Sequence, residues 1–495
     1  MAKILFIQQE KFFFKENIGV MQCSSVLKQN GHQVDVALIG GDGRLTKTEK
    51  PSVLSAFVAL AKEYYAAIRT QKERSEQNSA RREIIDYVRE YKPDIIGFSV
   101  LTINSVWTLK IADLLKRNGV RALIVAGGPH PTFFKDYINN DCIDAINIGE
   151  GEYSLLELAN AVERNRDITS IENLHVKKDG RVYRNPVRPL ANINELPFPD
   201  RDLYMKYEVF RKQKTYNFIA TRGCFYNCTF CFIHQWNVEY KEDPNKVRLR
   251  DIDGIISEIK EFAQKTRVEK LYFSDSTLNL DKKWTVDFLT RYGKEVGLPY
   301  SLNLRPNLLD DDIAKAIAAS GCETVRIGIE TGNEKNRRRI LGKYISDKKI
   351  YEAVDLLKKY RIKFVANVMF GLPGETLEEA METVEMLQKI EPYLPSPQLF
   401  HPYPGLNITR KAVKDGYVTE DELKEIGNNE YEISKSVLKQ RDIDSVVNLM
   451  KLSIIAVKFP VLWPLIKKLA HLKPNKIFSS AHVISSFILY WSRVH

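Results

Sequence analysis

Short hydrophobic runs alternate with amphipathic stretches along the first part of the chain. Five runs have the length and the β-branched content of buried strands, and they span residues 3–8, 33–39, 95–100, 122–128 and 145–149. Between them hydrophobic positions recur at helical spacing, as in residues 106–119, where Gly119 is typical of a helix C-terminus. This alternation predicts an α/β fold with a doubly wound parallel sheet of the Rossmann-like type. An insertion between residues 52 and 91 is helical and rich in charge, which predicts a solvated pair of helices.

A second series of strand and helix patterns occupies the middle of the chain. Its strand-like runs span residues 217–221, 270–275, 300–305, 324–330, 363–371 and 397–403. Helical patterns such as 253–265, 310–321 and 347–360 connect them. Six βα units predict a partial (β/α)6 barrel, because a closed barrel of this type has eight. The carboxyl ends of the strands are where such barrels carry their active sites.

The regular pattern loosens between residues 167 and 208. Residues 175–186 predict a hairpin that turns at Asp179 and Gly180, and prolines interrupt the segment that follows. The sequence therefore predicts four parts: a Rossmann-like domain over residues 1–166, a hairpin and linker over 167–208, a partial barrel over 209–425, and a helical, basic and apolar region over 426–495.

Composition and charge narrow the class of protein. The 495 residues are 44% hydrophobic and 28% charged, which is the balance of a folded globular protein. The net charge is +11, but residues 445–495 contain seven Lys or Arg and no acid, so the other residues carry only +4. This excess is too small to indicate a nucleic-acid-binding body. The amino terminus lacks the apolar core of a signal peptide, and no uncharged run is long enough to span a membrane, so we expect a cytoplasmic protein.

The acid-free C-terminal segment has two interpretations. Leu, Ile, Val, Phe and Trp mix with lysines between residues 449 and 478, which is typical of a helix at a membrane surface. The alternative is a helical cap on the barrel whose lysines face water. The first interpretation predicts peripheral contact with the inner face of the membrane.

Three cysteines follow the first barrel strand in the segment TRGCFYNCTFCFIH. Cys224, Cys228 and Cys231 have the spacing C-x3-C-x2-C, and thiolates that are so close in the chain can hold one iron–sulfur cluster. Three ligands for four irons leave one iron open to another molecule. The alternative is a zinc site in which His234 completes a Cys₃His set. The other cysteines, Cys23, Cys142 and Cys322, fit small buried side chains.

The cysteine loop and the later strand ends resemble the radical S-adenosylmethionine (SAM) superfamily. The resemblance rests on CTFC, SDSTLNLDKKW (274–284), IGIETGNE (327–334) and NVMFGLPGET (367–376). It implies a [4Fe-4S] cluster on the three cysteines and a SAM site at the strand ends. Arg305, which ends the third strand, could pair with the SAM carboxylate because a guanidinium forks onto a carboxylate. The implied SAM-binding residues are Phe230, Asp275, Arg305, Glu330, Thr331, Asn367 and Gly371.

The amino-terminal domain is similar to the one in the cobalamin-binding class of this superfamily. Its expected cofactor loops lie at strand carboxyl ends, where open α/β sheets bind ligands. The implied cobalamin-binding residues are Ser99, Thr102, Gly127, Gly128, His130, Gly149, Glu150 and Gly151. One feature departs from many cobalamin proteins: the loop after the first strand, QQEKFFFKENIG, contains no D-x-H-x-x-G histidine. The resemblance then implies a cobalt without a protein histidine below it.

The resemblance implies an oxygen-sensitive methyltransferase that acts on an unactivated carbon. The expected route is hydrogen abstraction by a 5′-deoxyadenosyl radical and methyl transfer from methylcobalamin. Two alternatives remain: a cyclization, ring contraction or oxidation without methyl transfer, and a cobalamin sensor or carrier without catalysis. The expected partners are a small-molecule or lipid substrate and an electron donor such as flavodoxin or ferredoxin. Tyr403 is a candidate for the substrate pocket, and no catalytic acid or base is identified.

Overall fold

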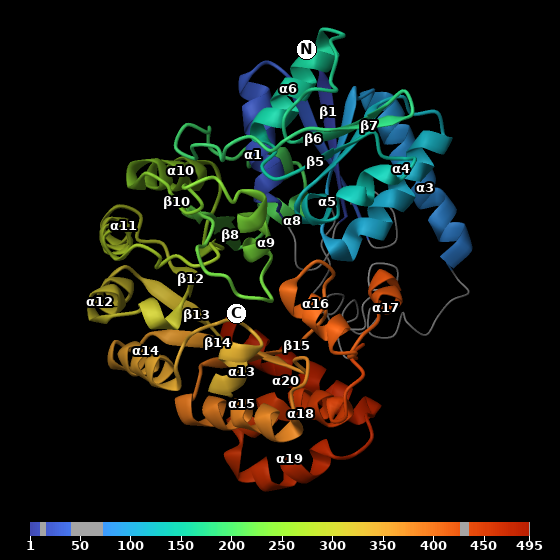
Figure 1. Cartoon of the computed structure of the whole chain (residues 1–495). Helices are drawn as coiled ribbons and strands as arrows, with labels where there is room; N and C mark the ends of the chain where they lie inside the picture. The colour runs from blue at the N-terminus through green and yellow to red at the C-terminus, as the bar shows by residue number, and fades with distance from the viewer. Residues whose placement is uncertain (10–15, 41–72, 426–434, 495) are drawn as a thin grey trace. The chain divides into compact units, whose positions relative to one another are not determined.

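The computed structural model describes residues 1–9, 16–40, 73–425 and 435–494 (Figure 1). The chain divides into two compact units, Met1–Lys214 and Thr215–His495. Residues 10–15 of the loop after the first strand, which lacks the D-x-H-x-x-G histidine, lie outside the described residues. Residues 52–72 of the predicted insertion also lie outside them. The remainder of that insertion forms the predicted helix, α3 (Glu73–Tyr91).

The first unit is built on a seven-stranded sheet with the order β2-β1-β3-β4-β5-β6-β7. Its strands are β1 (Lys3–Gln9), β2 (Gln33–Ile39), β3 (Ile95–Ser99), β4 (Leu123–Gly127), β5 (Ala145–Asn147), β6 (Leu174–Lys178) and β7 (Arg181–Arg184). The first five are parallel and coincide with the five predicted runs. Because β1 lies between β2 and β3, the strand order reverses at β1 and β3, which opens a crevice at their carboxyl ends.

Helices cover both faces of this sheet, as a doubly wound fold requires. They are α1 (Ile18–Gln29), α3, α4 (Ser105–Arg117), α5 (Pro129–Phe133), α6 (Glu152–Glu163), α7 (Asp202–Met205) and α8 (Glu208–Arg211). Met21 of α1 and Leu158 of α6 share one buried cluster with Phe6 of β1. Val88 of α3 and Leu115 of α4 belong to the cluster on the opposite face. The predicted Rossmann-like fold is therefore confirmed.

Residues 174–184 form the predicted hairpin and extend the same sheet. β6 pairs antiparallel with both β5 and β7. Asp179 and Gly180 have φ values of +50° and +71°, as a two-residue turn between twisted strands favours. Further along, Tyr204 and Phe210 are buried in the cluster that contains α1 and α6. The segment predicted as hairpin and linker thus contributes to the sheet and core of the first unit.

The second unit contains six parallel strands in the order β15-β14-β13-β12-β11-β8. They are β8 (Thr215–Phe218), β11 (Lys270–Phe273), β12 (Tyr300–Leu304), β13 (Cys322–Glu330), β14 (Lys363–Phe370) and β15 (Leu394–Leu399). The short strands β9 (Thr221–Arg222) and β10 (Arg248–Leu249) form a separate antiparallel pair. The order follows the chain, with β8 and β15 at the two edges, which confirms the predicted six-unit partial barrel.

Several of the connecting helices begin at side chains that cap them. The connecting helices are α9 (Phe232–Glu239), α10 (Ile252–Lys265), α11 (Lys282–Glu295), α12 (Asp311–Ala319), α13 (Glu334–Arg339), α14 (Asp347–Lys359), α15 (Leu377–Ile390), α16 (Asn407–Lys414) and α17 (Glu420–Glu425). Asp281, Asp310 and Ser346 each accept a hydrogen bond from the first turn of the helix that follows. Such N-caps stabilise a helix by about 1 kcal/mol and fix where each strand-to-helix loop ends.

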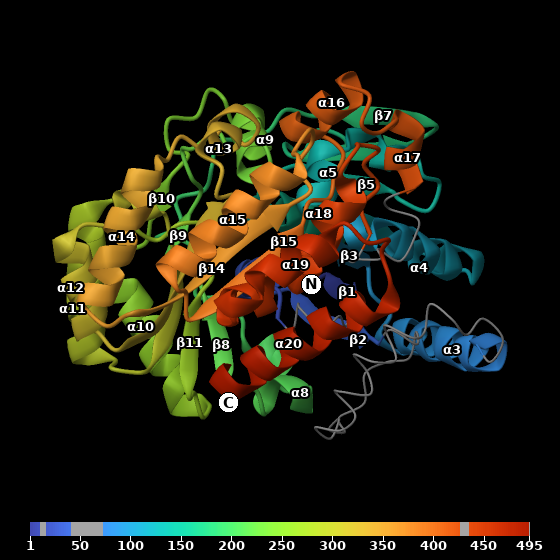
Figure 2. The same ribbon diagram turned by 90° about the horizontal axis from the view of Figure 1, so that it is seen from below.

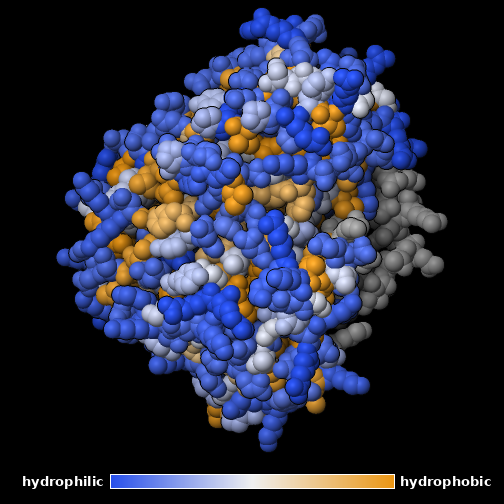
Figure 3. Space-filling view, in the orientation of Figure 1, coloured by the Kyte–Doolittle hydropathy of each residue, from blue (hydrophilic) through white to orange (hydrophobic). Residues whose placement is uncertain are grey.

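Three further helices follow the barrel: α18 (Ile443–Lys458), α19 (Trp463–Ala470) and α20 (Lys476–Val494), with a 3₁₀ turn at Pro460–Leu462. α18 is mostly buried and packs against α15 and β15, while α19 and α20 pack on α18 (Figure 2). α18 is therefore a cap on the barrel. On the face of the molecule shown in Figure 3, hydrophilic residues predominate and hydrophobic residues lie between them. In the described part of the chain no helix is long and apolar enough to cross a membrane.

Candidate active site

The three cysteines of the motif lie on one compact loop between β9 and α9. The loop starts at Gly223, whose φ is +92° and whose added Cβ would lie 1.8 Å from the carbonyl oxygen of Lys246, so only glycine fits there. Cys231 N–H donates to the carbonyl of Cys228 at 3.1 Å. The side chain of Asn237 in α9 donates to the carbonyl of Cys224 at 2.8 Å. These two hydrogen bonds help to fix the backbone of the loop that carries the three thiols.

The thiols influence one another and are shielded from water. Burial raises the pKa of Cys224, and burial together with the neighbouring thiols Cys228 and Cys224 raises the pKa of Cys231 to about 11. All three sulfurs therefore lie close enough for their charges to interact. A cluster that binds the thiolates would offset this mutual repulsion, since metal binding displaces protons from cysteine. The donor set fits a thiolate-bound iron–sulfur cluster.

His234, the fourth ligand of the zinc alternative, makes other contacts. Its Nδ1 lies 3.1 Å from the Oδ1 of Asn227, and its Nε2 lies 2.7 Å from the Nδ2 of Asn407. Among residues 1–9, 16–40, 73–425 and 435–494, no three His, Cys, Asp or Glu side chains, the three motif cysteines included, are grouped as the ligands of one metal ion. The ring of His234 is thus held between two asparagine side chains.

Arg305 connects the end of β12 to the cysteine loop. Its Nη1 lies 3.8 Å from the sulfur of Cys228, and its guanidinium lies 3.4 Å from the centre of the Tyr226 ring. The Nε donates to Asn307 at 2.9 Å, while the backbone of Arg305 exchanges two hydrogen bonds with the side chain of Asn279. The guanidinium is buried and fixed, with its Nη1 beside the sulfur of Cys228. A carboxylate placed there could accept from it in a forked geometry.

Asp275 follows β11 and is 2% exposed. Its Oδ1 accepts from the backbone N–H of Ala220 and from the hydroxyl of Thr221, at 2.9 and 2.8 Å. Its Oδ2 is buried and has no hydrogen-bond partner among the described residues. Burial raises the pKa of Asp275 to about 6. An ammonium group would satisfy the second oxygen, which fits the amino group expected of SAM.

Glu330, at the end of β13, forms an ion pair that the sequence did not reveal. The Nζ of Lys343 lies 2.7 Å from its Oε1 and donates to the carbonyl of Gly328 at 2.7 Å. Glu330 has a φ of +70°, and the register with β14 shifts between Gly328 and Glu330. A Cβ at Gly328 would lie 2.3 Å from the Glu330 carboxylate and 2.8 Å from Lys343. The glycine of the G-x-E element therefore makes room for a buried ion pair at a bulge.

Thr331 and Gly371 have structural contacts in this unit. Thr331 is fully buried, and its hydroxyl lies 3.2 Å from that of Thr383 in α15. Gly371 has a φ of +75°, and its N–H donates to the Oε2 of Glu375 at 2.7 Å. The side chain of Thr331 is directed toward α15. The loop that begins at Gly371 is held by a hydrogen bond to the buried carboxylate of Glu375.

Aromatic residues surround the inner ends of the last strands. Met369 of β14 packs with Phe230, Phe232 and Tyr403 against one hydrophobic cluster. Asn367, two residues before Met369, is half-buried on the same face of the strand. Burial raises the pKa of Tyr403. Phe230, Asn367 and Tyr403 therefore lie on the side of the sheet that carries the cysteine loop.

The predicted cobalamin loops of the first unit are tied together by Thr132, a residue the sequence analysis did not select. Its hydroxyl donates to the carbonyl of Gly128 at 2.8 Å and accepts from the N–H of Gly149 at 3.0 Å. Gly128 has a φ of +99°, and an added Cβ would lie 3.0 Å from the carbonyl of Val100. Gly127, Gly128, Gly149 and Gly151 thus present backbone rather than side chains at the carboxyl edge of the sheet, which suits a large flat ligand.

The polar residues of these loops are largely engaged with one another. Asn17 donates to the hydroxyl of Ser99 at 2.9 Å. The Nδ1 of His130 lies 3.3 Å from the hydroxyl of Thr102, and burial lowers the pKa of His130 to about 4. The Oε2 of Glu150 accepts from the N–H of Ala191 at 3.0 Å. His130 is consequently a neutral ring at pH 7, and Glu150 anchors the segment that follows the hairpin.

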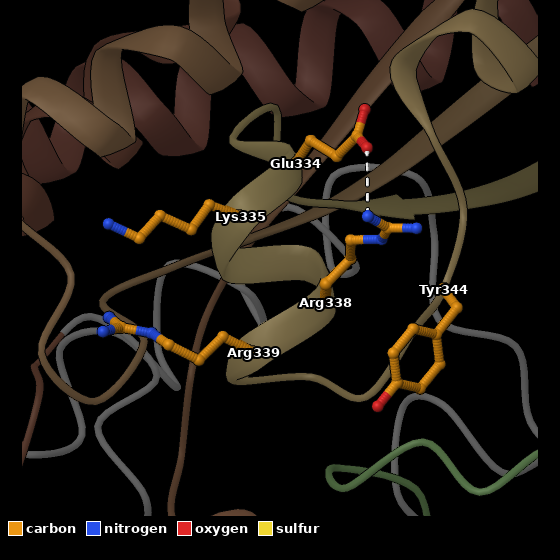
Figure 4. Close-up of a pocket in the computed structure, with 5 residues that line it drawn as sticks. All are labelled: Glu334, Lys335, Arg338, Arg339 and Tyr344. Carbon is orange, nitrogen blue, oxygen red and sulfur yellow. Dashed lines mark ion pairs between the residues drawn. The ribbon is translucent and has the colours of Figure 1, made fainter.

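A basic cleft borders the cysteine loop on the α13 side. It is lined by Glu334, Lys335, Arg338, Arg339 and Tyr344 (Figure 4). Lys335 and Arg339 extend to one side of α13, whereas Arg338 pairs with Glu334 at 3.9 Å on the other. The cleft adjoins the motif because Thr229 N–H donates to the carbonyl of Leu341, in the segment between α13 and Tyr344.

Two family models match the chain. The B12 binding domain matches residues 15–159, and the Radical SAM superfamily matches residues 218–387. A Pyrococcus horikoshii protein named "Uncharacterized methyltransferase PH0819" is 28% identical over 67% of this chain and 72% of its own. The "Anaerobic magnesium-protoporphyrin IX monomethyl ester cyclase" of Rubrivivax gelatinosus is 26% identical over 64% of this chain and 59% of its own.

A solved structure shares the fold. The radical S-adenosylmethionine methyltransferase TsrM from Kitasatospora setae, with cobalamin and a [4Fe-4S] cluster bound, aligns with a TM-score of 0.62. The alignment covers 85% of this chain and 79% of TsrM at 17% identity.

Proposed function

Because this chain belongs to the radical SAM enzymes that carry a cobalamin-binding domain, we propose that it transfers a methyl group to an unactivated carbon of a small molecule. The observation that carries the proposal is the contact between Arg305 and Cys228 at the barrel's strand ends. It joins a carboxylate-binding guanidinium to the cysteine motif in the same buried volume. A relative named as a methyltransferase supports methyl transfer over other outcomes.

Each cofactor has residues that would hold it. Cys224, Cys228 and Cys231 would bind three irons of a [4Fe-4S] cluster. The free oxygen of Asp275 would accept from the amino group of SAM, and Arg305 would donate to its carboxylate. The other residues proposed to face SAM are Phe230, Glu330, Asn367 and Gly371, and Thr331 would contribute only its backbone, because its side chain is buried against Thr383. When bound, the cluster supplies the electron that cleaves SAM, and cobalamin carries the methyl group.

The chain itself orients these groups and excludes water. Lys343 holds the Glu330 carboxylate in place through their ion pair, and Tyr226 fixes the plane of the Arg305 guanidinium. Burial around Cys224 and Cys228 keeps solvent from the sulfurs. In the first unit, the proposed cobalamin-facing residues are Ser99, Thr102, Gly127, Gly128, His130, Gly149, Glu150 and Gly151. The bond from His130 to Thr102 favours a role in the wall of that site.

We also propose that the electron comes from an acidic donor protein of the flavodoxin or ferredoxin class. The basic cleft of Lys335, Arg338 and Arg339 borders the cysteine loop, and positive patches speed the association of acidic partners. Tyr344, 72% exposed, offers an aromatic contact in the same cleft.

The experiment is anaerobic turnover of the reconstituted protein with SAM labelled in its methyl group, followed by mass analysis of the products. We expect 5′-deoxyadenosine, S-adenosylhomocysteine and one labelled methyl group in the product, at two equivalents of SAM for each methyl transferred. A second candidate is radical chemistry without methyl transfer, favoured by the similarity to the anaerobic cyclase. It would give 5′-deoxyadenosine with no methyl in the product. The absence of 5′-deoxyadenosine would leave only a cobalamin carrier or sensor.

A further inference from the structure

The C-terminal helices expose hydrophobic side chains that the active site does not use. Of the large hydrophobic side chains exposed in the described part of the chain, seven lie between residues 459 and 484. Val461 is 85% exposed and Ile477 is 76% exposed. The complete set is Phe459, Val461, Leu462, Leu465, Leu472, Ile477 and Ile484. Such a concentration in one short segment marks an interaction surface.

The α19 segment separates into a buried and an exposed side. Ile466 and Ala470 are buried and face α18, on which the helix packs. Leu465 and Lys468 are exposed and lie three residues apart in α19, whereas Val461 lies in the 3₁₀ turn before the helix and Leu472 follows its end. Val461, Leu465 and Leu472 are exposed hydrophobic residues. We call these three residues the C-terminal apolar face.

Positive charge accompanies this face. Lys468 lies three residues after Leu465 in α19, and Lys473 follows Leu472; both are exposed. The amino group of Lys467 lies 5.5 Å from the centre of the Trp463 ring, so an aromatic and a cation are paired at its border. No Asp or Glu occurs between residues 445 and 495. At the lower edge of the second unit, where Figure 1 places α19, hydrophobic and hydrophilic residues lie side by side in Figure 3.

We propose that the C-terminal apolar face docks on the surface of an anionic lipid bilayer. Exposed hydrophobic side chains with lysines and no acidic residue beside them in the sequence complement a membrane with negative headgroups and an apolar interior. Self-association through this same segment would bring lysines together without acidic partners, because the segment contains no Asp or Glu. The helix would lie in the plane of the interface, because its buried side remains packed on α18. The proposal does not depend on which reaction the barrel performs.

The test is co-sedimentation of the full-length protein with vesicles of phosphatidylcholine alone and of phosphatidylcholine mixed with phosphatidylglycerol. We expect binding to the mixed vesicles that weakens as salt is raised, and at least about tenfold weaker binding to phosphatidylcholine alone. The triple variant Val461→Ser, Leu465→Ser, Leu472→Ser should lose binding to both. Its iron content and thermal unfolding should match those of the wild type, since all three side chains face solvent.

Two double variants test whether the position of the lysines beside the C-terminal apolar face, rather than the net charge of the protein, determines binding. Lys468→Glu with Lys473→Glu should weaken binding to the mixed vesicles about tenfold or more. Lys294→Glu with Lys315→Glu makes the same change in net charge on the barrel helices α11 and α12, and should leave binding nearly unchanged. Equal loss in both pairs would overturn the proposal, as would sedimentation of the serine variant at the wild-type level. It would also be overturned if no vesicle bound and light scattering showed a dimer that the serine variant abolishes.

Discussion

Arg305 lies with its Nη1 3.8 Å from the sulfur of Cys228, although the two residues are 77 positions apart in the chain. The Tyr226 ring lies under the same guanidinium, at 3.4 Å. A buried cation beside thiols favours their ionised form, and it lowers the pKa of Cys224 against the larger raising effect of burial. Arg305 therefore interacts with the thiols of the cysteine loop and can also bind a carboxylate placed beside them.

Replacement of Arg305 by Lys should show whether SAM binding needs only the positive charge of Arg305 or also the planar guanidinium. A lysine keeps the positive charge but cannot fork onto a carboxylate or stack flat on Tyr226. We expect SAM to bind about 10- to 100-fold more weakly, the range that corresponds to one lost charge-assisted hydrogen bond, with unchanged iron content. Equilibrium binding of SAM to the reconstituted variant measures this. Arg326→Lys is the control. Arg326 of β13 also lies over a tyrosine ring, that of Tyr272 in β11, at 5.8 Å, and it lies outside the cysteine motif.

The three motif cysteines should be individually necessary for the cluster. Replacing Cys224, Cys228 or Cys231 with Ala removes one thiolate, and we expect less iron per chain and loss of the brown colour after anaerobic reconstitution. Cys322→Ala is the matched control. Cys322 is also a shielded thiol, with a pKa raised by burial to about 12, but it lies in β13 outside the motif. Full cluster absorbance in the Cys228 variant would contradict the assignment of that ligand.

The sequence predicted the architecture well because hydrophobic periodicity reports directly on strands and helices. All six barrel strands were found, although β8 and β13 begin two residues earlier and β15 three residues earlier than predicted. β8 and β15 lie at the sheet edges, where one-sided pairing leaves the pattern of burial less regular, whereas β13 is a central strand. The prolines at 395 and 397 within β15 also concealed its start, since proline argues against a central strand.

Contacts within the site were harder to predict because they join residues distant in the chain. No spacing rule connects Glu330 to Lys343 or Thr132 to Gly149. Thr331 was selected beside Glu330 because the two are adjacent in the motif. Its side chain is fully buried against α15, because Thr331 lies just beyond the end of β13 and the positive φ of Glu330 redirects the chain there.

Removal of Lys343 should destabilise the barrel. In Lys343→Met the Glu330 carboxylate would remain buried without its partner, at a cost of about 3 kcal/mol in the free energy of unfolding. Lys349→Met is the control, because the pair of Lys349 with Glu352 is exposed and contributes less than about 1 kcal/mol. Urea unfolding of the apoprotein measures both. A change below about 1 kcal/mol in the first variant would show that the buried pair contributes no more than the exposed one.

Reversal of charge in the basic cleft should slow electron delivery without altering the cluster. We expect Lys335→Glu with Arg339→Glu to lower turnover supported by reduced flavodoxin about tenfold, with a weaker dependence on salt. Turnover with dithionite, a small reductant, should match the wild type. Lys348→Glu with Lys359→Glu on α14 changes the net charge equally and is the control. Equal rates with flavodoxin in both double variants would exclude this cleft as the docking site.

The buried carboxyl group of Glu375 should make stability depend on pH between about pH 4.5 and 8. Its Oε2 accepts from the N–H groups of Gly371 and Leu372, at 2.7 and 3.2 Å, while its Oε1 is buried with no partner among the described residues. Burial raises its pKa from 4.5 to about 8. The folded protein therefore keeps a proton that the unfolded chain has lost above about pH 4.5. Stability from this group is full below pH 4.5 and is lost as the pH rises through 8.

Glu375→Gln should remove this dependence, because the amide oxygen still accepts from both N–H groups and carries no titrating proton. We expect the free energy of unfolding of the wild type to fall by a few kcal/mol relative to the variant between pH 5 and 9, on the scale of about 1.4 kcal/mol per pKa unit. Chemical denaturation across that range measures the difference. Glu378→Gln, on the exposed side of α15, should change stability by the same amount at every pH. Parallel pH profiles for the wild type and the Glu375 variant would mean that this carboxylate is already ionised in the folded protein, and that its two backbone donors outweigh its burial.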